Sequence, residues 1–280
     1  GLFGRGTSGE GCDAESLELP GVQRDLVEAV LATGTPVILV LLTGRPYAVG
    51  WALDACSAVV QAFFPGEEGA AAIAGVISGR VNPSGRLPVS LPRATGSQPY
   101  SYLHPLLGGP SAVSNLNAVP ARPFGYGLSY TTFVHSDLQV ASSSVPTGGL
   151  IEVSVLASNT GSRSGADVVQ LYAHDPVASV TRPVAQLVGY ARVELEPGEA
   201  AVVRFSVPTT RVAFSGRDLV RAVEPGAIDL WVGGSCAERE TQTRVELVGA
   251  LHPVTNASAR WVDVVVERRS HDSAPGPIDR

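Results

Sequence analysis

A glycine-rich run and the acidic residue that follows it are the first residues whose types and spacing could do chemistry. Residues Gly4-Arg-Gly-Thr-Ser-Gly9 have the G-x-G-x-x-G spacing of a dinucleotide-binding loop, and Glu10 comes directly after them. Such a loop joins a strand to a helix whose N-terminal amides hold the pyrophosphate. Too few residues precede Gly4 to form that strand, and the carboxylate of Glu10 would repel a phosphate. The sequence therefore argues against a nucleotide-binding oxidoreductase, and we expect a titration with a nicotinamide cofactor to show no binding.

The carboxyl group of Glu10 offers a different chemistry. Gly9 and Gly11 leave the backbone free to adopt unusual angles and leave Glu10 without bulky neighbours in the sequence, so a ligand could approach it closely. A carboxyl group in such a position can donate or accept a proton during a reaction. The alternative is a solvated loop glutamate without a catalytic role.

Other charged residues compete for a functional role. Glu67 and Glu68 stand where a helix is expected to begin, and negative charge there favours a capping role. Asp13 could hold the loop around Glu10 by accepting backbone N–H bonds. Arg45 follows an expected strand end, where open α/β sheets bind ligands. A ligand contact and a structural ion pair are both open for Arg45, and we favour the ion pair.

The elements that must position these residues alternate in the first half of the chain. Residues 19–34 predict a helix with Pro20 at its first turn and Gly34 at its end. The unbroken apolar run at 35–43 predicts a strand buried on both faces of a parallel sheet. A second strand is expected at 58–64 and a helix of small residues at 67–78. Alternating strands and helices indicate an α/β layered domain.

The pattern changes to an all-β one later in the chain. A short strand is expected at 87–91, and residues 93–123 read as a long loop. Seven later runs resemble strands, at 151–155, 168–173, 186–195, 203–207, 228–232, 244–248 and 261–266. Turn residues such as Asn159-Thr-Gly161 and Glu196-Pro-Gly198 separate several of them, which predicts an immunoglobulin-like β-sandwich. The Ser, Asp and Pro-rich end of the chain is expected to be disordered.

Composition excludes several classes of function. The 280 residues are enough for two domains, and no apolar run is long enough to span a bilayer. The net charge is −6 and the basic residues, all arginine, are scattered, so we expect neither a nucleic-acid nor a membrane partner. Three distant cysteines and five histidines without ligand spacing predict no metal site. Because the sequence starts at Gly1 and contains no methionine, we interpret it as a processed product or a fragment.

Three stretches of the sequence, in this order, resemble the C-terminal portion of glycoside hydrolase family 3, the β-glucosidase and β-xylosidase family. They are Phe64-Pro-Gly-Glu-Glu-Gly69 with Gly79-Arg-Val-Asn-Pro-Ser-Gly-Arg-Leu-Pro-Val89; Pro123-Phe-Gly-Tyr-Gly-Leu-Ser-Tyr-Thr-Thr-Phe133; and Asn159-Thr-Gly161 with Val168-Val-Gln-Leu-Tyr172, Arg182-Pro183 and Leu195-Glu-Pro-Gly198. The likeness covers nearly all of residues 1–250, and the combination is far more specific than any one stretch.

This resemblance implies an architecture. Residues 1–130 would be the later part of an α/β sandwich domain, residues 131–250 a fibronectin-III-like β-sandwich, and residues 251–280 a partly disordered tail. The N-terminal (β/α)8 barrel of the family would be absent. The glycines of residues 124–130 are expected to allow a tight backbone path, with the aromatic residues packing where the two domains join.

The resemblance also implies a function. Residues Ser8-Gly-Glu-Gly11 are similar to the family segment that carries the acid/base glutamate of a retaining mechanism, which assigns that role to Glu10. The aspartate nucleophile would come from the barrel, no cofactor is implied, and the substrate would be an oligosaccharide or β-glycoside ending in glucose or xylose. Without the nucleophile, this chain alone is predicted to be inactive. A non-catalytic carbohydrate-binding or scaffolding protein is the alternative, and the sequence does not predict a cellular location.

Overall fold

The computed structural model describes residues 6, 11–97, 101–115 and 117–269, and these fall into two compact units. The first unit draws on Gly1–Val81, Leu87–Ser101 and Leu107–Phe124, and the second on Asn82–Arg86, Tyr102–Leu106 and Gly125–Arg280. Most of the run at 4–9, Glu10 and the Ser, Asp and Pro-rich end at 270–280 lie outside the described residues. No helix in the described part of the chain is long and apolar enough to cross a membrane.

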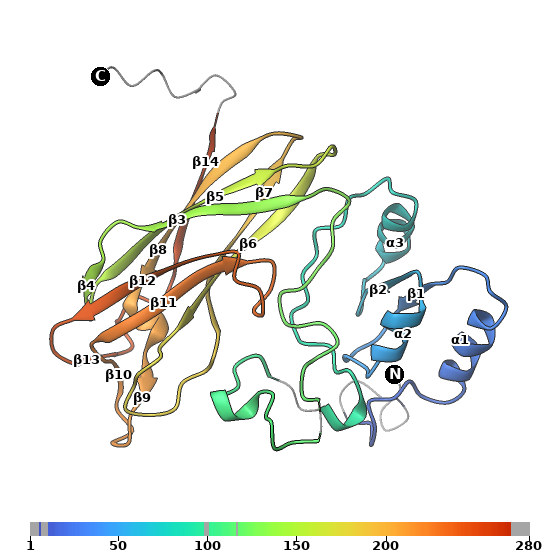
Figure 1. Cartoon of the computed structure of the whole chain (residues 1–280), viewed down its shortest axis with the longest axis horizontal. Coiled ribbons are helices and arrows are strands. Elements are labelled where there is room, and N and C mark those ends of the chain that lie inside the picture. The colour runs from blue at the N-terminus through green and yellow to red at the C-terminus, as the bar shows by residue number, and fades with distance from the viewer. Residues whose placement is uncertain (1–5, 7–10, 98–100, 116, 270–280) are drawn as a thin grey trace. The chain divides into compact units, whose positions relative to one another are not determined.

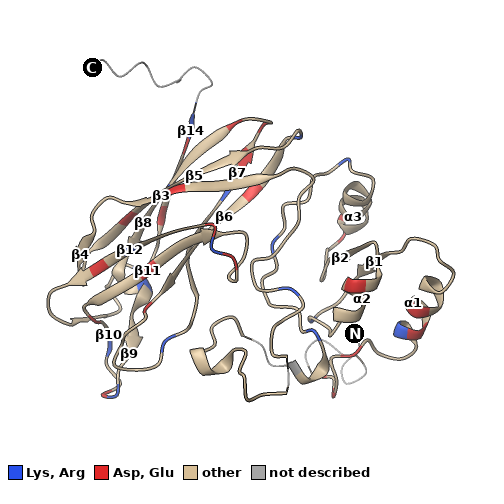
Figure 2. Cartoon of the chain, viewed as in Figure 1, with Lys and Arg blue, Asp and Glu red and all other residues tan. Residues whose placement is uncertain are grey.

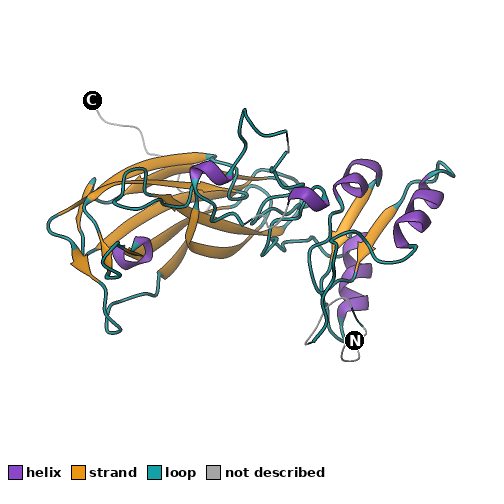
Figure 3. Cartoon of the chain, turned by 90° about the horizontal axis from the view of Figure 1, so that it is seen from below, coloured by secondary structure: helices purple, strands orange, loops and turns teal. Residues whose placement is uncertain are grey.

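The first unit alternates strands and helices, as predicted (Figures 1 and 3). Its elements, in order, are α1 (Gln23–Leu31), β1 (Ile38–Leu41), α2 (Gly50–Ala55), β2 (Ala58–Gln61) and α3 (Gly69–Ile77). The strands β1 and β2 pair in parallel, with Ile38 opposite Ala58 and Leu41 opposite Gln61. The first helix starts at Gln23 rather than at Pro20, and Gly34 closes the turn after it with a φ of 78°.

Two predictions about this unit are wrong. The strand at 35–43 is not buried on both faces: β1 covers only four residues, and the side chain of Ile38 is 47% exposed. The reason is that the described sheet has only two strands. So narrow a sheet offers little surface on which helices can pack, and its strands stay partly exposed. The expected strand at 87–91 is only an isolated bridge between Leu91 and Arg122. The loop that follows contains the short 3-10 helices Thr95–Ser97 and Leu106–Gly108.

The second unit is the predicted β-sandwich, built from two main sheets and one small sheet (Figure 1). The five-stranded sheet has the order β4-β12-β11-β6-β7, with β4 (Ser144–Pro146), β6 (Gly165–His174), β7 (Gln186–Leu195), β11 (Gly226–Gly233) and β12 (Thr241–Val248). The four-stranded sheet has the order β14-β8-β5-β3, with β3 (Phe133–Val140), β5 (Leu150–Asn159), β8 (Ala200–Pro208) and β14 (Asp263–Arg269). The small sheet comprises β9 (Phe214–Ser215), β10 (Arg221–Val223) and β13 (His252–Pro253), and the 3-10 helix Thr209–Val212 precedes it.

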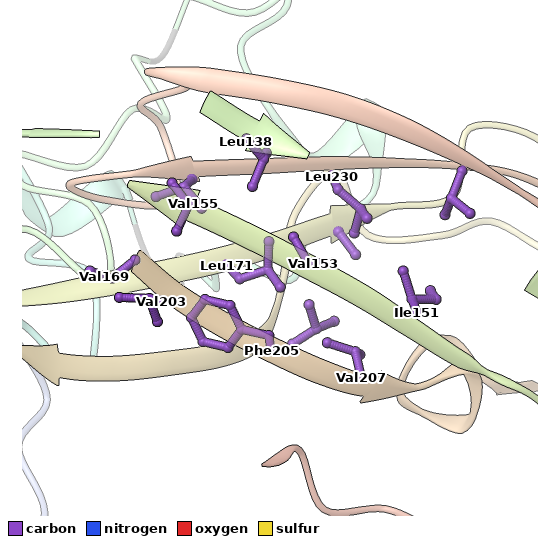
Figure 4. Packing of buried hydrophobic residues seen from close by; sticks show 14 of the residues in the cluster. Leu138, Ile151, Val153, Val155, Val169, Leu171, Val203, Phe205, Val207 and Leu230 are labelled. Atoms are coloured by element: carbon purple, nitrogen blue, oxygen red, sulfur yellow. The ribbon is translucent and has the colours of Figure 1, made fainter. Parts of the chain in front are cut away.

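Alternating apolar residues of both main sheets form the core of the sandwich. Figure 4 shows Ile151, Leu171, Phe205 and Leu230, from strands of both sheets, pointing into the same interior. All four are at most 1% exposed. Burial of such side chains contributes about 1.5–3 kcal/mol each relative to exposure. The sandwich therefore has a large core of its own, in contrast to the small cluster around Val49 in the first unit.

The Asn-Pro-Ser-Gly-Arg segment at Asn82–Arg86 belongs to the sandwich unit and contacts residues that are distant from it in sequence. The side-chain oxygen of Asn82 accepts the N–H of Tyr130 at 2.7 Å, and its amide donates to the carbonyl of Ser164 at 3.0 Å. The expected tight path of residues 124–130 is confirmed at two glycines. A Cβ at Gly125 would lie 2.2 Å from the Gln170 side-chain oxygen, and one at Gly127 would lie 2.2 Å from a backbone oxygen of the same segment.

A buried ionic cluster joins this segment to β3, to β6 and to the bend just before β12. The guanidinium of Arg86 donates to one carboxylate oxygen of Asp167 at 3.0 Å, and His135 Nε2 lies 2.7 Å from the other. His135 Nδ1 lies 3.0 Å from Glu240 Oε2. With a carboxylate at each ring nitrogen, the imidazole is held as a doubly donating cation. Burial opposes this charge, but the hydrogen bonds to Asp167 and Glu240 outweigh it and raise the pKa of His135 to about 9.

This cluster predicts a loss of stability at alkaline pH. The unfolded His135 has the ordinary pKa of 6.5, so its contribution is complete below that pH and is lost as the pH rises to about 9. We expect the free energy of unfolding to fall by about 3 kcal/mol over this range because of His135 alone. Chemical denaturation of wild type and His135→Gln, followed across the range, measures the difference. Parallel pH profiles for the two proteins would contradict this account.

Candidate active site

The carboxyl ends of β1 and β2 carry the candidate site of the first unit. Thr43 and Arg45 follow β1, and Phe63 and Phe64 follow β2. Because the two strands are parallel, the segments that leave their carboxyl ends emerge at the same edge of the sheet. Ligands of open α/β sheets bind at this edge.

Glu10 itself lies outside the described residues, but the segment that follows it is well defined. Gly11 has a φ of 70°, a left-handed conformation that suits glycine. Asp13 Oδ1 accepts the N–H of Ala14 at 2.8 Å, which is the backbone interaction expected of it. The same oxygen accepts a hydrogen bond from Arg45 Nη1 at 2.9 Å, so the favoured structural ion pair of Arg45 is confirmed. The backbone N–H of Ala14, followed by Arg45, lowers the pKa of Asp13.

Two further contacts fix the same segment to the first unit. The carbonyl of Leu17 accepts the N–H of Ala48 at 2.8 Å, and Leu19 is buried in the core with Leu41 and Val49. Together with the ion pair of Arg45, these contacts tie residues 13–19 to the chain that leaves the carboxyl end of β1. Residues 13–19 are therefore fixed at the carboxyl edge of the sheet.

The capping role expected of Glu67 and Glu68 is only partly present. Glu68 occupies the N-cap position of α3, but its side chain makes no capping hydrogen bond. The prediction that Glu68 caps the helix through a side-chain hydrogen bond is therefore wrong. Its φ of −81° and ψ of 3° also differ from those of the usual extended N-cap residue. Both carboxylates remain exposed at the positive end of the helix dipole.

Sequence reasoning missed a group of polar atoms between β1 and β2. The amide of Gln61 donates to Thr43 Oγ1 at 2.8 Å, and Thr43 Oγ1 donates to the carbonyl of Arg45 at 2.8 Å. Gln61 Oε1 and Arg45 Nε are buried without a hydrogen-bond partner among the described residues. Unpaired buried donors and acceptors are rare and call for a partner. The feature of the sequence that could have indicated this group was Gln61, a polar residue at the end of the otherwise apolar strand β2.

An aromatic pair marks the end of β2. Phe63 has a φ of 53°, which is uncommon for a residue with a bulky side chain. Phe64 is 75% exposed. Backbone strain and an exposed aromatic ring at the ligand edge of a sheet are typical of a binding site. The carboxyl edge of β1 and β2 thus has an exposed aromatic ring at Phe64 and, below the surface, one unpaired donor and one unpaired acceptor among the described residues.

The described residues give no indication of a metal centre. No group of three His, Cys, Asp or Glu side chains among them is placed to hold an ion. Acidic and basic residues are interspersed within each unit (Figure 2), as in the exposed pair of Arg244 and Asp229, 2.6 Å apart.

Comparison with known proteins identifies both parts of the chain. Residues 2–130 match the glycosyl hydrolase family 3 C-terminal domain, and residues 167–236 match a fibronectin type III-like domain. The chain is 38% identical over 254 residues to a periplasmic beta-glucosidase of Salmonella typhimurium, covering 87% of this chain and 33% of that protein. It is also 38% identical over 240 residues to a beta-xylosidase of Formosa agariphila, covering 85% of this chain and 33% of the relative.

Solved structures agree with these matches. A beta-glucosidase from Listeria innocua in complex with glucose superposes with a TM-score of 0.79 at 32% identity, covering 87% of this chain and 35% of that one. A β-glucosidase from Erythrobacter marinus gives a TM-score of 0.80 at 39% identity, covering 86% and 32%. The chain spans about a third of the length of the curated relatives that it matches. The resemblance seen in the sequence is confirmed: the chain belongs to glycoside hydrolase family 3 and corresponds to the C-terminal portion of its members.

Proposed function

We propose that this chain is the C-terminal part of an exo-acting, retaining β-glycosidase that removes terminal β-linked glucose or xylose, with Glu10 as its acid/base. The relatives are named beta-glucosidases and beta-xylosidases, and Listeria innocua beta-glucosidase was solved with glucose and, as a variant, with laminaribiose. The observation that carries the proposal is the fixed position of residues 13–19, which begin three residues after Glu10, at the carboxyl edge of β1.

The proposed chemistry needs two carboxyl groups about 5–5.5 Å apart. One attacks the anomeric carbon, and the other protonates the leaving oxygen and then deprotonates the water that releases the sugar. Glu10 has the second role in this proposal. The nucleophile is an aspartate of a (β/α)8 barrel that precedes this part of the chain in the complete protein. The ion pair of Asp13 with Arg45 would hold the segment that follows Glu10 at the sheet.

The experiment compares the 280-residue chain with the protein isolated from its source. An intact mass of about 55 kDa or more is expected for the native protein, because a barrel adds about 250 residues. The native protein should hydrolyse aryl β-glucosides or β-xylosides, and the 280-residue chain should not. Turnover by the purified 280-residue chain alone would overturn the proposal that the nucleophile comes from the barrel and the acid/base from this chain. A native mass near 29.0 kDa without activity would instead favour the carbohydrate-binding or scaffolding protein.

A further inference from the structure

The last strand of the sandwich, β14, has an open edge with an apolar centre. It forms the end of the four-stranded sheet and pairs on one side with β8, and no described strand pairs with its other side. All seven of its residues are exposed, and Val264, Val265 and Val266 retain 37%, 54% and 41% exposure. An edge strand of this length presents a row of unpaired N–H and C=O groups that can pair with another strand.

The apolar residues of β14 lie on both faces of the sheet. Val264 and Val266 are opposite Phe205 and Val203 of β8, which point into the core. Val265 is opposite Arg204, which is exposed on the outer face. Because opposite residues of an antiparallel pair share a face, a strand added to β14 would cover apolar groups on both sides at once.

We propose that β14 pairs with β14 of a second copy of this chain, in antiparallel orientation, so that two four-stranded sheets become one continuous sheet. A two-fold axis perpendicular to the sheet keeps each face on its own side, so the axis must lie midway between one residue of β14 and the same residue of the second copy. This condition restricts the register to a few choices, each centred on one residue of β14.

Charge selects one of these registers. Centring on Val266 pairs all seven residues and places Asp263 opposite Arg269 of the second copy. Centring on Val265 would place Asp263 opposite Glu267, and centring on Glu267 would place that carboxylate opposite itself. Like charges in opposite positions destabilise an antiparallel pair, whereas opposite charges stabilise it. Among the registers that pair at least five residues of β14, the sequence Asp-Val-Val-Val-Glu-Arg-Arg is therefore complementary to itself only around Val266.

Ion pairs within one chain leave the two end charges available. Glu267 already lies 3.2 Å from Arg204, and Arg268 lies 3.2 Å from Glu199. Among the described residues, no ion pair involves Asp263 or Arg269. These two residues share the outer face of the strand, since both are separated from Val265 by an even number of positions. They would form two symmetric pairs in the dimer.

Charge reversal and mixing test this dimer in the 280-residue chain. Sedimentation equilibrium at micromolar to submillimolar concentrations should show a reversible dimer for wild type. Asp263→Arg and Arg269→Asp should each weaken self-association at least about tenfold, because each creates two like-charged pairs. An equimolar mixture of the two variants should recover dimers, since each reversed charge then meets its opposite. Asp25→Arg and Arg217→Asp, exposed positions outside β14, are matched controls that should dimerise as wild type does.

Circular dichroism of each variant verifies that the sandwich is folded before association is compared. A wild-type chain that stays monomeric over the whole range would overturn the proposal. Variants that associate as tightly as wild type, or a mixture that does not recover dimers, would overturn the register. The test is independent of the proposed glycosidase activity, because neither the measurement nor the variants involve the candidate active site.

Discussion

Replacing Glu10 with glutamine in the full-length protein should lower kcat/KM for disaccharides and alkyl β-glycosides by about 10²- to 10⁴-fold. Glutamine has the size of glutamate but cannot protonate the leaving oxygen. Aryl glycosides with an acidic phenol leaving group should lose far less in the step that forms the glycosyl-enzyme, because such a group departs without a proton. Steady-state kinetics on a series of leaving groups, with burst-phase measurements, separates this step from the later attack of water.

A small anionic nucleophile gives a second readout of the same role. Azide attacks without giving up a proton, so it should restore turnover of a good substrate by Glu10→Ala and yield a β-glycosyl azide. Glu15→Gln and Glu67→Gln remove other exposed carboxylates of the same unit and should keep near wild-type kinetics. Equal losses on good and poor leaving groups for Glu10→Gln, without azide rescue, would assign the acid/base role elsewhere.

Asp167→Asn should destabilise the sandwich unit by about 3–5 kcal/mol. The carboxylate is 4% exposed and contacts two buried cations, Arg86 and His135, whose side chains are 12% and 3% exposed. Removing its charge leaves the two cations close together with only Glu240 to neutralise them. The lost stability should shift the midpoint of chemical denaturation, followed by circular dichroism of the β-sheet.

A surface pair of the same chemistry is the control for this variant. Asp229 lies 2.6 Å from Arg244, but that guanidinium is 62% exposed. Asp229→Asn should therefore cost no more than about 1 kcal/mol. Equal midpoints of chemical denaturation for the two asparagine variants would contradict this account. They would mean that the buried cluster does not stabilise the attachment of residues 82–86 to the sandwich.

The elements with the clearest periodicity were predictable from the sequence. The strand at 186–195 has the same bounds as β7, and the alternating runs at 151–155 and 203–207 lie inside β5 and β8. Their alternation reflects one buried and one solvated face, which is local information. β3 escaped prediction because its apolar residues do not alternate regularly: Asp137 has a φ of 54°, and the pairing with β5 shifts register between Ser136 and Gln139.

In the first unit, the order of elements was predictable but their burial was not. The apolar run at 35–43 has the composition of a central strand, yet burial depends on what covers it. Val22 and Leu26 of the first helical segment are likewise 73% and 63% exposed. Hydropathy records the tendency of a side chain to be covered, whereas exposure depends on the neighbouring strands and helices.

The sequence by itself predicted the two kinds of domain and the family, because alternation, turn residues and motifs are carried by neighbouring positions, and its resemblance to the family makes Glu10 the candidate acid/base, which stays a prediction. Only the tertiary structure brought together Arg86, His135, Asp167 and Glu240, which are separated by up to 154 positions in the chain. It also paired Asp13 with Arg45 and left β14 at an open edge. Coulomb and hydrogen-bond energies depend on distance in space, and the folded backbone sets that distance.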